Sequence, residues 1–290
     1  MGVMPIHEQV NANPKAERFR RIRELLTRHG RTKAERFLVE GPQAVRELVR
    51  YAPEAVSDVY VTVNSAEPDA AFISPVVGSL AGQAMQARLY VHKVTREVAD
   101  HISTDCQGVF AVAYTDAFER WQRGQEIGDK PFVAAFWQVR DPGNAGTVIR
   151  SADAAGCDAV IFVDDCVDML NPKVIRSTTG SLFHIPVLTM SEGDMLAWAD
   201  AHGCRTAAAD VYGTPDHQPM PLPQYMRVHN TDGSVVLFGN EARGLTIPVL
   251  ERMDDIVSIP MYGKAESLNL AMSASIALMS MAMSSHVETM

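Results

Sequence analysis

Three loops of this 290-residue sequence carry the side chains best suited to chemistry. Each loop includes or follows a run of apolar residues, and the three read "DPGNAGTVIRSADAAG" (141–156), "FGNEARGL" (238–245) and "IPMYGKAESLNLAMSASIAL" (259–278). Their candidate functional groups are two amides, a guanidinium, a carboxylate and a hydroxyl, on Asn144, Asn269, Arg150, Glu241 and Ser267. Loops that leave the carboxyl ends of parallel strands meet at one edge of a sheet, where α/β proteins bind ligands. The sequence therefore predicts that the three loops form one polar pocket.

The first loop also admits a dinucleotide-binding interpretation. Asp164 lies about twenty residues past Gly143, at the distance where an acidic residue would bind a ribose hydroxyl. Counted from Gly143, however, the glycine fingerprint has alanine at position 145 and valine at position 148. The missing glycines are those that permit close approach of the phosphate and close packing of the helix, so a nicotinamide cofactor is disfavoured.

Alternating strand and helix patterns divide the chain into two α/β regions. We expect an N-terminal domain over residues 1–118, a polar linker over 119–131 and a C-terminal domain over 132–290. Strands are expected at 36–41, 56–63, 87–92, 108–114, 132–139, 158–164, 185–189, 205–210, 234–239 and 255–260. Helices are expected at 15–30, 146–155, 172–179, 191–202 and 268–285. Irregular structure is expected for the first 14 residues and for a long loop over 212–233.

The composition is that of a globular protein, because 47% of the residues are hydrophobic. The first residues match neither a secretory signal nor a myristoylation motif. The longest apolar stretch, 268–283, is short for a membrane span, so we expect a cytoplasmic protein with no membrane partner. The four cysteines form no C-x-x-C pair, which favours free buried thiols and no metal site.

Basic residues gather near the start of the chain although its net charge is −9. Residues 15–50 hold eleven Lys and Arg against five Asp and Glu. A local basic face of this kind is what electrostatic binding of RNA phosphates requires. The candidate RNA-binding residues are Arg18, Arg21, Arg23, Arg31 and Lys33. The alternative is a solvated helix face with ion pairs such as Glu17 with Arg21.

The three loop sequences resemble the three signature motifs of the SpoU/TrmH family, the RNA ribose 2′-O-methyltransferases of the knotted SPOUT superfamily. The resemblance covers roughly residues 131–286 and extends to the connecting segment "NPKVIRSTTGSLFHIPV" (171–187). It implies a C-terminal α/β domain with a parallel sheet and a trefoil knot. "RFLVEGPQAVRELV" (36–49) is similar to the opening of the family's ribosomal-protein-like RNA-binding domain. The resemblance also implies S-adenosylmethionine as methyl donor, no metal, and a homodimer.

The resemblance assigns roles to the polar residues of the three loops. Arg150 would position a ribose or phosphate oxygen and stabilise the developing alkoxide, because a guanidinium hardly deprotonates. The alternative chemical role for Arg150 is that of a general base, deprotonated with the help of a phosphate or by an unusual environment. Asn144 would hydrogen-bond the catalytic groups or hold the loop, and Glu241 would orient Arg150 or the side chains of the third motif. Ser267 and Asn269 would lie near the acceptor ribose. Each has a structural alternative: a surface ion pair for Arg150, a left-handed turn for Asn144, a helix N-terminal acid for Glu241, and helix capping for Ser267 and Asn269.

The resemblance places the methyl donor against Gly239, Ile259, Met261 and Leu268. Ile259 and Leu268 would form an apolar slot for adenine, and Gly239 would permit close approach. In the last helix, Met272, Met279, Met281 and Met283 favour core and subunit interface over a cofactor site.

Three functions remain under consideration. The first is RNA 2′-O-methylation, of ribosomal RNA in preference to transfer RNA. The second is a catalytically silent RNA-binding protein of the same fold, and the third is the nicotinamide oxidoreductase.

Overall fold

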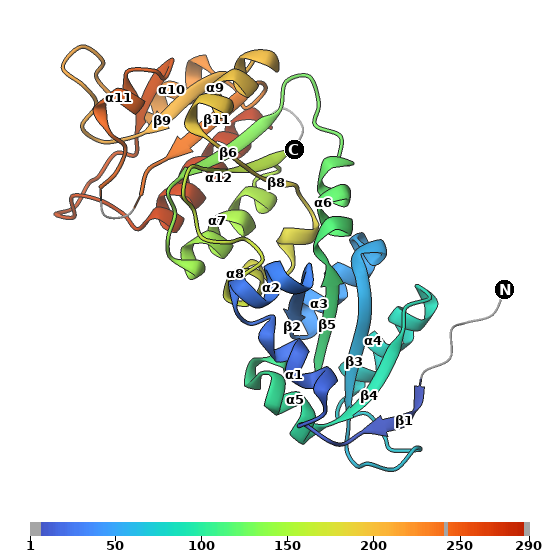
Figure 1. The fold of residues 1–290 in the computed structure, drawn as a ribbon. Coiled ribbons are helices and arrows are strands. Elements are labelled where there is room, and N and C mark those ends of the chain that lie inside the picture. Colours follow the sequence, from blue (N-terminus) through green and yellow to red (C-terminus); the bar gives the residue numbers. More distant parts are fainter. Residues whose placement is uncertain (1–6, 241–242, 287–290) are drawn as a thin grey trace. The chain divides into compact units, whose positions relative to one another are not determined.

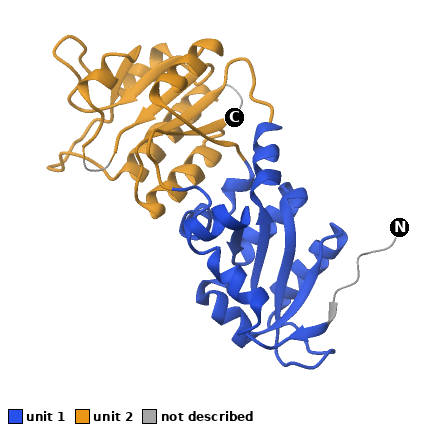
Figure 2. Ribbon diagram, in the orientation of Figure 1, with its two compact units in different colours: residues 1–124, 168–184 blue, residues 125–167, 185–290 orange. Residues whose placement is uncertain are grey.

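A computed structural model describes residues 7–240 and 243–286 of the chain (Figure 1). The chain forms two compact units: unit 1 holds residues 1–124 and 168–184, and unit 2 holds residues 125–167 and 185–290 (Figure 2). This division differs from the expected one in the segment 168–184, which belongs to unit 1 although both of its neighbours in sequence belong to unit 2. Helix α6 (Thr115–Arg123) also occupies the first part of the expected linker.

Unit 1 is built on a five-stranded mixed sheet in the order β1-β4-β3-β5-β2. Strands β1, β4 and β3 pair in parallel, whereas β5 runs antiparallel to β3 and β2. The strands are β1 (His7–Asn11), β2 (Arg36–Glu40), β3 (Val56–Val63), β4 (Val91–Thr95) and β5 (Val109–Tyr114). The helices, besides α6, are α1 (Glu17–Glu24), α2 (Arg28–Ala34), α3 (Pro42–Tyr51), α4 (Pro75–Gln86), α5 (Arg96–Ile102) and α8 (Pro172–Thr178).

The basic N-terminal segment forms two helices, and the expectation of one helix over 15–30 is wrong. Phe19, Ile22 and Leu25 pack into the core of unit 1, and the basic side chains of α1 lie on its other faces. The helix then breaks at Thr27, whose hydroxyl accepts a hydrogen bond from the Gly30 amide at 3.0 Å and so caps α2. A Cβ on Gly30 would lie 2.0 Å from the Glu24 carbonyl oxygen. Gly30 therefore permits a tight reversal between two helices and does not end one.

Two segments expected to be irregular contain regular structure. Residues 7–11 form β1, which pairs with β4 at the sheet edge. Part of the expected loop over 212–233 forms strand β10 (Met220–Pro221) and helix α10 (Leu222–Val228). Both segments lack the hydrophobic periodicity that makes such elements recognisable in a sequence.

Unit 2 contains a seven-stranded sheet in the order β10-β12-β9-β11-β6-β7-β8, and every pairing between its strands is parallel. The expected α/β fold with a parallel sheet is confirmed. Besides β10, the strands are β6 (Phe132–Trp137), β7 (Ala159–Val163), β8 (Val187–Met190), β9 (Arg205–Ala209), β11 (Ser234–Phe238) and β12 (Asp255–Ser258). Besides α10, the helices are α7 (Pro142–Ala154), α9 (Glu192–Ala201), α11 (Ile247–Leu250) and α12 (Leu270–Ser285).

Helices cover both faces of this sheet, and its inner strands β6 and β7 are apolar along their whole length. Every residue of β6 is buried. One core combines side chains of the sheet with Met195 of α9 and with Val249 and Leu250 of α11. The opposite face carries α7 and α12, which lie side by side (Figure 1). The sheet thus fixes α7 and α12 relative to the loops at its carboxyl edge.

Candidate active site

A cavity of about 550 Å³ lies in unit 2 at the carboxyl ends of three neighbouring strands, β12, β9 and β11. Its wall is formed by the loops that follow these strands, together with Leu270 and Ser273 of the first turn of α12. The volume is that of a pocket for a small ligand. The second and third polar loops therefore meet at one pocket, as predicted from their positions after strands. The prediction that the first loop shares this pocket is wrong for the described wall, which contains no residue of 141–156.

All four residues expected to bind the methyl donor lie in the wall of this cavity: Gly239, Ile259, Met261 and Leu268. The side chains of Ile259, Met261 and Leu268 are half-buried and give the wall an apolar surface. An apolar surface of this kind suits a flat heterocycle such as adenine.

The backbone of the loop after β11 requires glycine at position 239. A Cβ at this position would lie 2.5 Å from the carbonyl carbon of Gly244 and 2.7 Å from the amide nitrogen of Leu245. The loop after β11 folds back here, and the Gly244 amide donates to the Asn240 carbonyl oxygen at 2.8 Å. Gly239 is therefore required first by the loop's own backbone, which in turn shapes the cavity.

The first polar loop becomes part of α7, which begins earlier than expected. Asp141 caps the helix, because its Oδ1 accepts a hydrogen bond from the Asn144 amide at 2.8 Å, and Pro142 occupies the first turn. Asn144 lies within this first turn, so its alternative as a left-handed turn residue is wrong.

Asn144 and Asn269 join the first and third loops. The Asn269 side-chain amide donates to Oδ1 of Asn144 at 3.2 Å. The Asn269 Oδ1 caps α12 by accepting from the amides of Ala271 at 2.9 Å and Met272 at 3.4 Å. The capping role expected as an alternative for Asn269 is thus confirmed, and one side chain serves both contacts. Ser267 does not cap α12 and instead lines the cavity.

Two further contacts, which sequence reasoning missed, hold the loops together. The Ser151 and Ser275 hydroxyl oxygens lie 2.7 Å apart between α7 and α12. The Asn240 side-chain amide donates through Nδ2 at 2.7 Å to the carbonyl oxygen of Gln138, which has a left-handed backbone with φ 52°. Small polar residues on helix faces and single asparagines carry no pattern that distinguishes such contacts in a sequence.

Arg150 is exposed on α7. Within residues 7–240 and 243–286 its guanidinium takes part in no ion pair or hydrogen bond. The alternative that Arg150 forms a surface ion pair therefore has no support among these residues. Glu241, the expected orienting carboxylate, lies outside the described residues.

Comparison with known proteins identifies the family. The model of the SpoU rRNA Methylase family matches residues 131–279, about half of the chain. The chain belongs to the SpoU rRNA methylase family. The resemblance of its three motifs is thereby confirmed, the protein is an RNA 2′-O-methyltransferase, and the nicotinamide alternative is wrong.

Individual relatives of this SpoU protein agree with the family assignment. It is 31% identical over 254 residues to the 23S rRNA (guanosine(2553)-2′-O)-methyltransferase RlmP of Bacillus subtilis, covering 88% of this chain and 91% of the relative. A crystal structure of an RNA 2′-O ribose methyltransferase superposes with a TM-score of 0.76 at 26% identity, covering 96% of this chain and 99% of the other. The SpoU methyltransferase AviRb of Streptomyces viridochromogenes, in complex with the cofactor AdoMet, superposes with a TM-score of 0.73 at 26% identity, covering 92% and 97% of the two chains.

The expected RNA-binding residues of this SpoU protein fall into three groups in unit 1, and the third group is Arg31 alone. Arg23 and Lys33 are exposed and make no ion pair with any residue that the structure describes. Arg18 pairs with Asp58 at 3.3 Å, and Arg21 pairs with Glu17, as the solvated-face alternative predicted.

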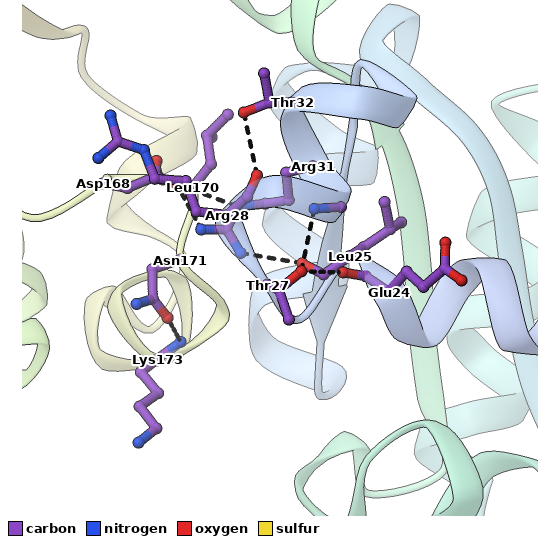
Figure 3. Close-up of polar contacts among 11 residues, drawn as sticks. Glu24, Leu25, Thr27, Arg28, Arg31, Thr32, Asp168, Leu170, Asn171 and Lys173 are labelled. Carbon is purple, nitrogen blue, oxygen red and sulfur yellow. Dashed lines mark hydrogen bonds and ion pairs between the residues drawn. The ribbon is translucent and has the colours of Figure 1, made fainter.

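Arg31 is buried, which contradicts its expected place on an RNA-binding surface. Its Nε and Nη2 donate to Oδ2 of Asp168 at 3.1 and 2.5 Å, and its Nη1 donates to the Leu25 carbonyl oxygen at 3.0 Å (Figure 3). The other carboxylate oxygen of Asp168 accepts from the Leu170 amide at 2.9 Å. Arg31 thus fastens the segment before α8 to α2 within unit 1, and all its polar groups face protein atoms.

Replacement of Asp168 by alanine is expected to lower the free energy of unfolding by about 3 kcal/mol, because it leaves the Arg31 guanidinium buried and unpaired. Urea denaturation followed by circular dichroism measures the change. Asp116→Ala, which removes an exposed ion pair with Arg120, is the control and is expected to change stability little. Equal effects of the two substitutions would contradict a structural role for the buried pair.

Metal and membrane features are absent from the part of the chain that the structure describes. This part contains no group of three or more His, Cys, Asp or Glu side chains that would hold a metal ion. No helix in the described ranges is long and apolar enough to cross a membrane. The four cysteines are free thiols, and burial raises the pKa of each, as in Cys166, where it reaches about 11.

Proposed function

We propose that this protein transfers a methyl group from S-adenosylmethionine to a ribose 2′-hydroxyl of ribosomal RNA. The observation that carries the proposal is the Asn144–Asn269 hydrogen bond. It ties α7, which bears Arg150, to the start of α12, which contributes to the wall of the cavity. The names of the relatives, among them RlmP, favour ribosomal RNA as the substrate.

The cavity fits the donor by its size and by the apolar character of its wall. Ile259, Met261 and Leu268 would contact the adenine, and the loop that Gly239 shapes would close over the donor through backbone groups. When bound, S-adenosylmethionine supplies an electrophilic methyl group, so this chain's residues need only bind, orient and activate the acceptor. No metal takes part in this proposal.

Arg150 acts on the acceptor. Its exposed guanidinium has five N–H donors and no acceptor, so it positions a ribose or phosphate oxygen and stabilises negative charge on the 2′-oxygen. Asn144 holds the first turn of α7 through Asn269, and Ser267 presents a hydroxyl to the cavity. Glu241 is retained as the residue that orients Arg150.

The proposal includes a trefoil knot in unit 2 and a homodimer, both of which the resemblance to SpoU proteins implies. Exposed apolar side chains on α12 support the dimer: Met272, Ile276 and Met283 recur at spacings of four and seven residues and so follow one side of the helix. Met281, by contrast, is buried in unit 2. We place the protein in the cytoplasm, as expected from the sequence, and without a membrane partner.

Unit 1 is proposed as the ribosomal-protein-like RNA-binding domain. Because Arg31 is buried, the phosphates are bound by the exposed cations of α1 and α2 that make no ion pair with any described residue: Arg23, Arg28 and Lys33. Joint replacement of these three by glutamate should weaken RNA binding and reduce the magnitude of the salt slope by about one for each phosphate that is no longer neutralised. Fluorescence anisotropy with ribosomal RNA fragments at several salt concentrations measures both quantities. A triple variant of Arg88, Arg96 and Arg123 to glutamate is the control for net charge, and an equal loss of affinity in that variant would contradict a local surface.

The proposed function is tested by incubating the protein with methyl-labelled S-adenosylmethionine and total RNA separated by size. Label in the ribosomal fraction is the expected result. Label in the transfer RNA fraction would show that the substrate is transfer RNA and not ribosomal RNA. Bound donor and bound RNA with no label in any fraction, assembled ribosomal subunits included, would favour the silent RNA-binding protein.

A further inference from the structure

Two charged side chains in the wall of the cavity have no role in the proposal above. Asp210 follows β9, and Arg243 belongs to the loop after β11. Among the described residues that line the cavity, these are the two ionisable acidic and basic groups, and most of the others are apolar. Opposite charges in an apolar pocket fix the orientation of a ligand that carries both signs.

Backbone amides hold one of the two carboxylate oxygens of Asp210 in place. Oδ1 accepts hydrogen bonds from the amides of Tyr212 and Gly213, both at 2.8 Å. Gly213 has a φ of +66°, a conformation that favours glycine and completes the turn. The Asp210 amide donates to the Val257 carbonyl oxygen at 3.0 Å, which ties the residue to the end of β12.

The second oxygen of Asp210 is available to a ligand. Oδ2 accepts no hydrogen bond from any residue within the described ranges, and it lies 3.8 Å from the position of a Cβ on Gly244 in the opposite loop. Arg243 is exposed next to that glycine, and its guanidinium makes no ion pair within the same ranges. A fixed carboxylate oxygen and an unpaired guanidinium thus belong to the two loops that face each other near Gly244.

We propose that Asp210 and Arg243 recognise the amino-acid end of the methyl donor. In this proposal Asp210 binds the donor's α-ammonium group, and Arg243 binds the donor's α-carboxylate. The inference rests on the proposed function, because it takes S-adenosylmethionine as the ligand of the cavity. A carboxylate and a guanidinium match the two charges of an α-amino acid, and hydrogen bonds between charged groups are stronger than neutral ones. Both residues are specificity determinants that bind the donor and take no part in methyl transfer.

Asp210→Asn is the informative variant, because asparagine keeps an oxygen for the turn amides and loses the negative charge. Isothermal titration calorimetry would compare four ligands: S-adenosylmethionine, S-adenosylhomocysteine, decarboxylated S-adenosylmethionine and methylthioadenosine. The first three carry the ammonium group, and methylthioadenosine lacks the whole amino-acid end. The expected result is a loss of affinity of about tenfold or more for the first three and no change for methylthioadenosine.

Arg243→Met provides the complementary variant. It should weaken binding of S-adenosylmethionine and S-adenosylhomocysteine, both of which carry the carboxylate, and leave decarboxylated S-adenosylmethionine and methylthioadenosine unaffected. The crossed pattern of the two variants distinguishes recognition of two separate groups from general damage to the cavity.

Three outcomes would overturn the inference. An equal loss of affinity for methylthioadenosine in Asp210→Asn would show that Asp210 binds the nucleoside or supports the cavity. Unchanged affinity for all four ligands in both variants would show that neither residue contacts the donor, with the proposed function still standing. Failure of the unaltered protein to bind any of the four would overturn the proposed function and this inference together.

Discussion

Replacement of Arg150 by alanine is expected to lower the rate of methyl transfer by about 100- to 1,000-fold, the effect of removing one donor to a developing oxyanion. The affinity for S-adenosylmethionine should not change, because Arg150 is absent from the described cavity wall and is exposed on α7. Single-turnover kinetics with saturating donor and RNA measure the first quantity, and calorimetry measures the second. Arg150→Lys should restore only part of the rate, because lysine keeps the charge and loses the planar set of donors.

Arg140 offers a matched control for this experiment. It is an exposed arginine that precedes α7 and pairs with Asp165 at 2.8 Å. Arg140→Ala removes the same charge from the neighbourhood and should leave both the transfer rate and the donor affinity almost unchanged. A normal rate in Arg150→Ala, or an equal reduction in Arg140→Ala, would contradict the assigned role.

Replacement of Gly239 by alanine is expected to abolish detectable donor binding. The added methyl group would lie 2.5 Å from a backbone carbon of Gly244, and backbone cannot move aside as a flexible side chain does. The loop after β11 must shift, and this loop forms part of the cavity wall. Calorimetric titration with S-adenosylmethionine measures the affinity. RNA binding through unit 1 should persist and serves as the check that the variant still folds.

Gly263→Ala is the control for Gly239→Ala. Gly263 lies between β12 and α12, and a Cβ there would meet no heavy atom within 4 Å. Donor binding should therefore be retained in Gly263→Ala. Retention of binding in both variants would show that the loop tolerates the methyl group and that Gly239 does not determine the shape of the cavity.

Much of unit 2 can be predicted from the sequence because several of its parallel strands, β6 and β7 above all, are continuous apolar runs. The stretch "FVAAFW" is buried at every position, and the polar residues that follow such runs come to the carboxyl edge of the sheet. Gly239, Ile259, Met261 and Leu268 also line the cavity, but these four are expected from the resemblance to SpoU proteins and not from the strand pattern. The predicted start of α7 is too late because Asp141 caps the helix from within a stretch that reads as a loop.

Two of the errors in unit 1 arise from contacts between segments distant in the chain, and a third arises from a local capping contact. Arg31 is like its basic neighbours in sequence, and its burial depends on Asp168, 137 positions away. Residues 7–11 are too polar to be recognised as a strand, and they form one by pairing with β4. The break at Thr27 is visible only as a capping hydroxyl three residues before Gly30, a weak signal inside a strongly amphipathic stretch.

The measurement that tests the central claim most directly is the chemical position of the transferred methyl group. Ribosomal RNA methylated by this protein with labelled donor would be hydrolysed in alkali, which cleaves each linkage through attack by the free 2′-hydroxyl. If Arg150 activates a ribose oxygen beside the cavity, the label will be recovered in alkali-resistant dinucleotides. Label recovered in mononucleotides would place the methyl group on a base and would contradict the role of Arg150 at the ribose.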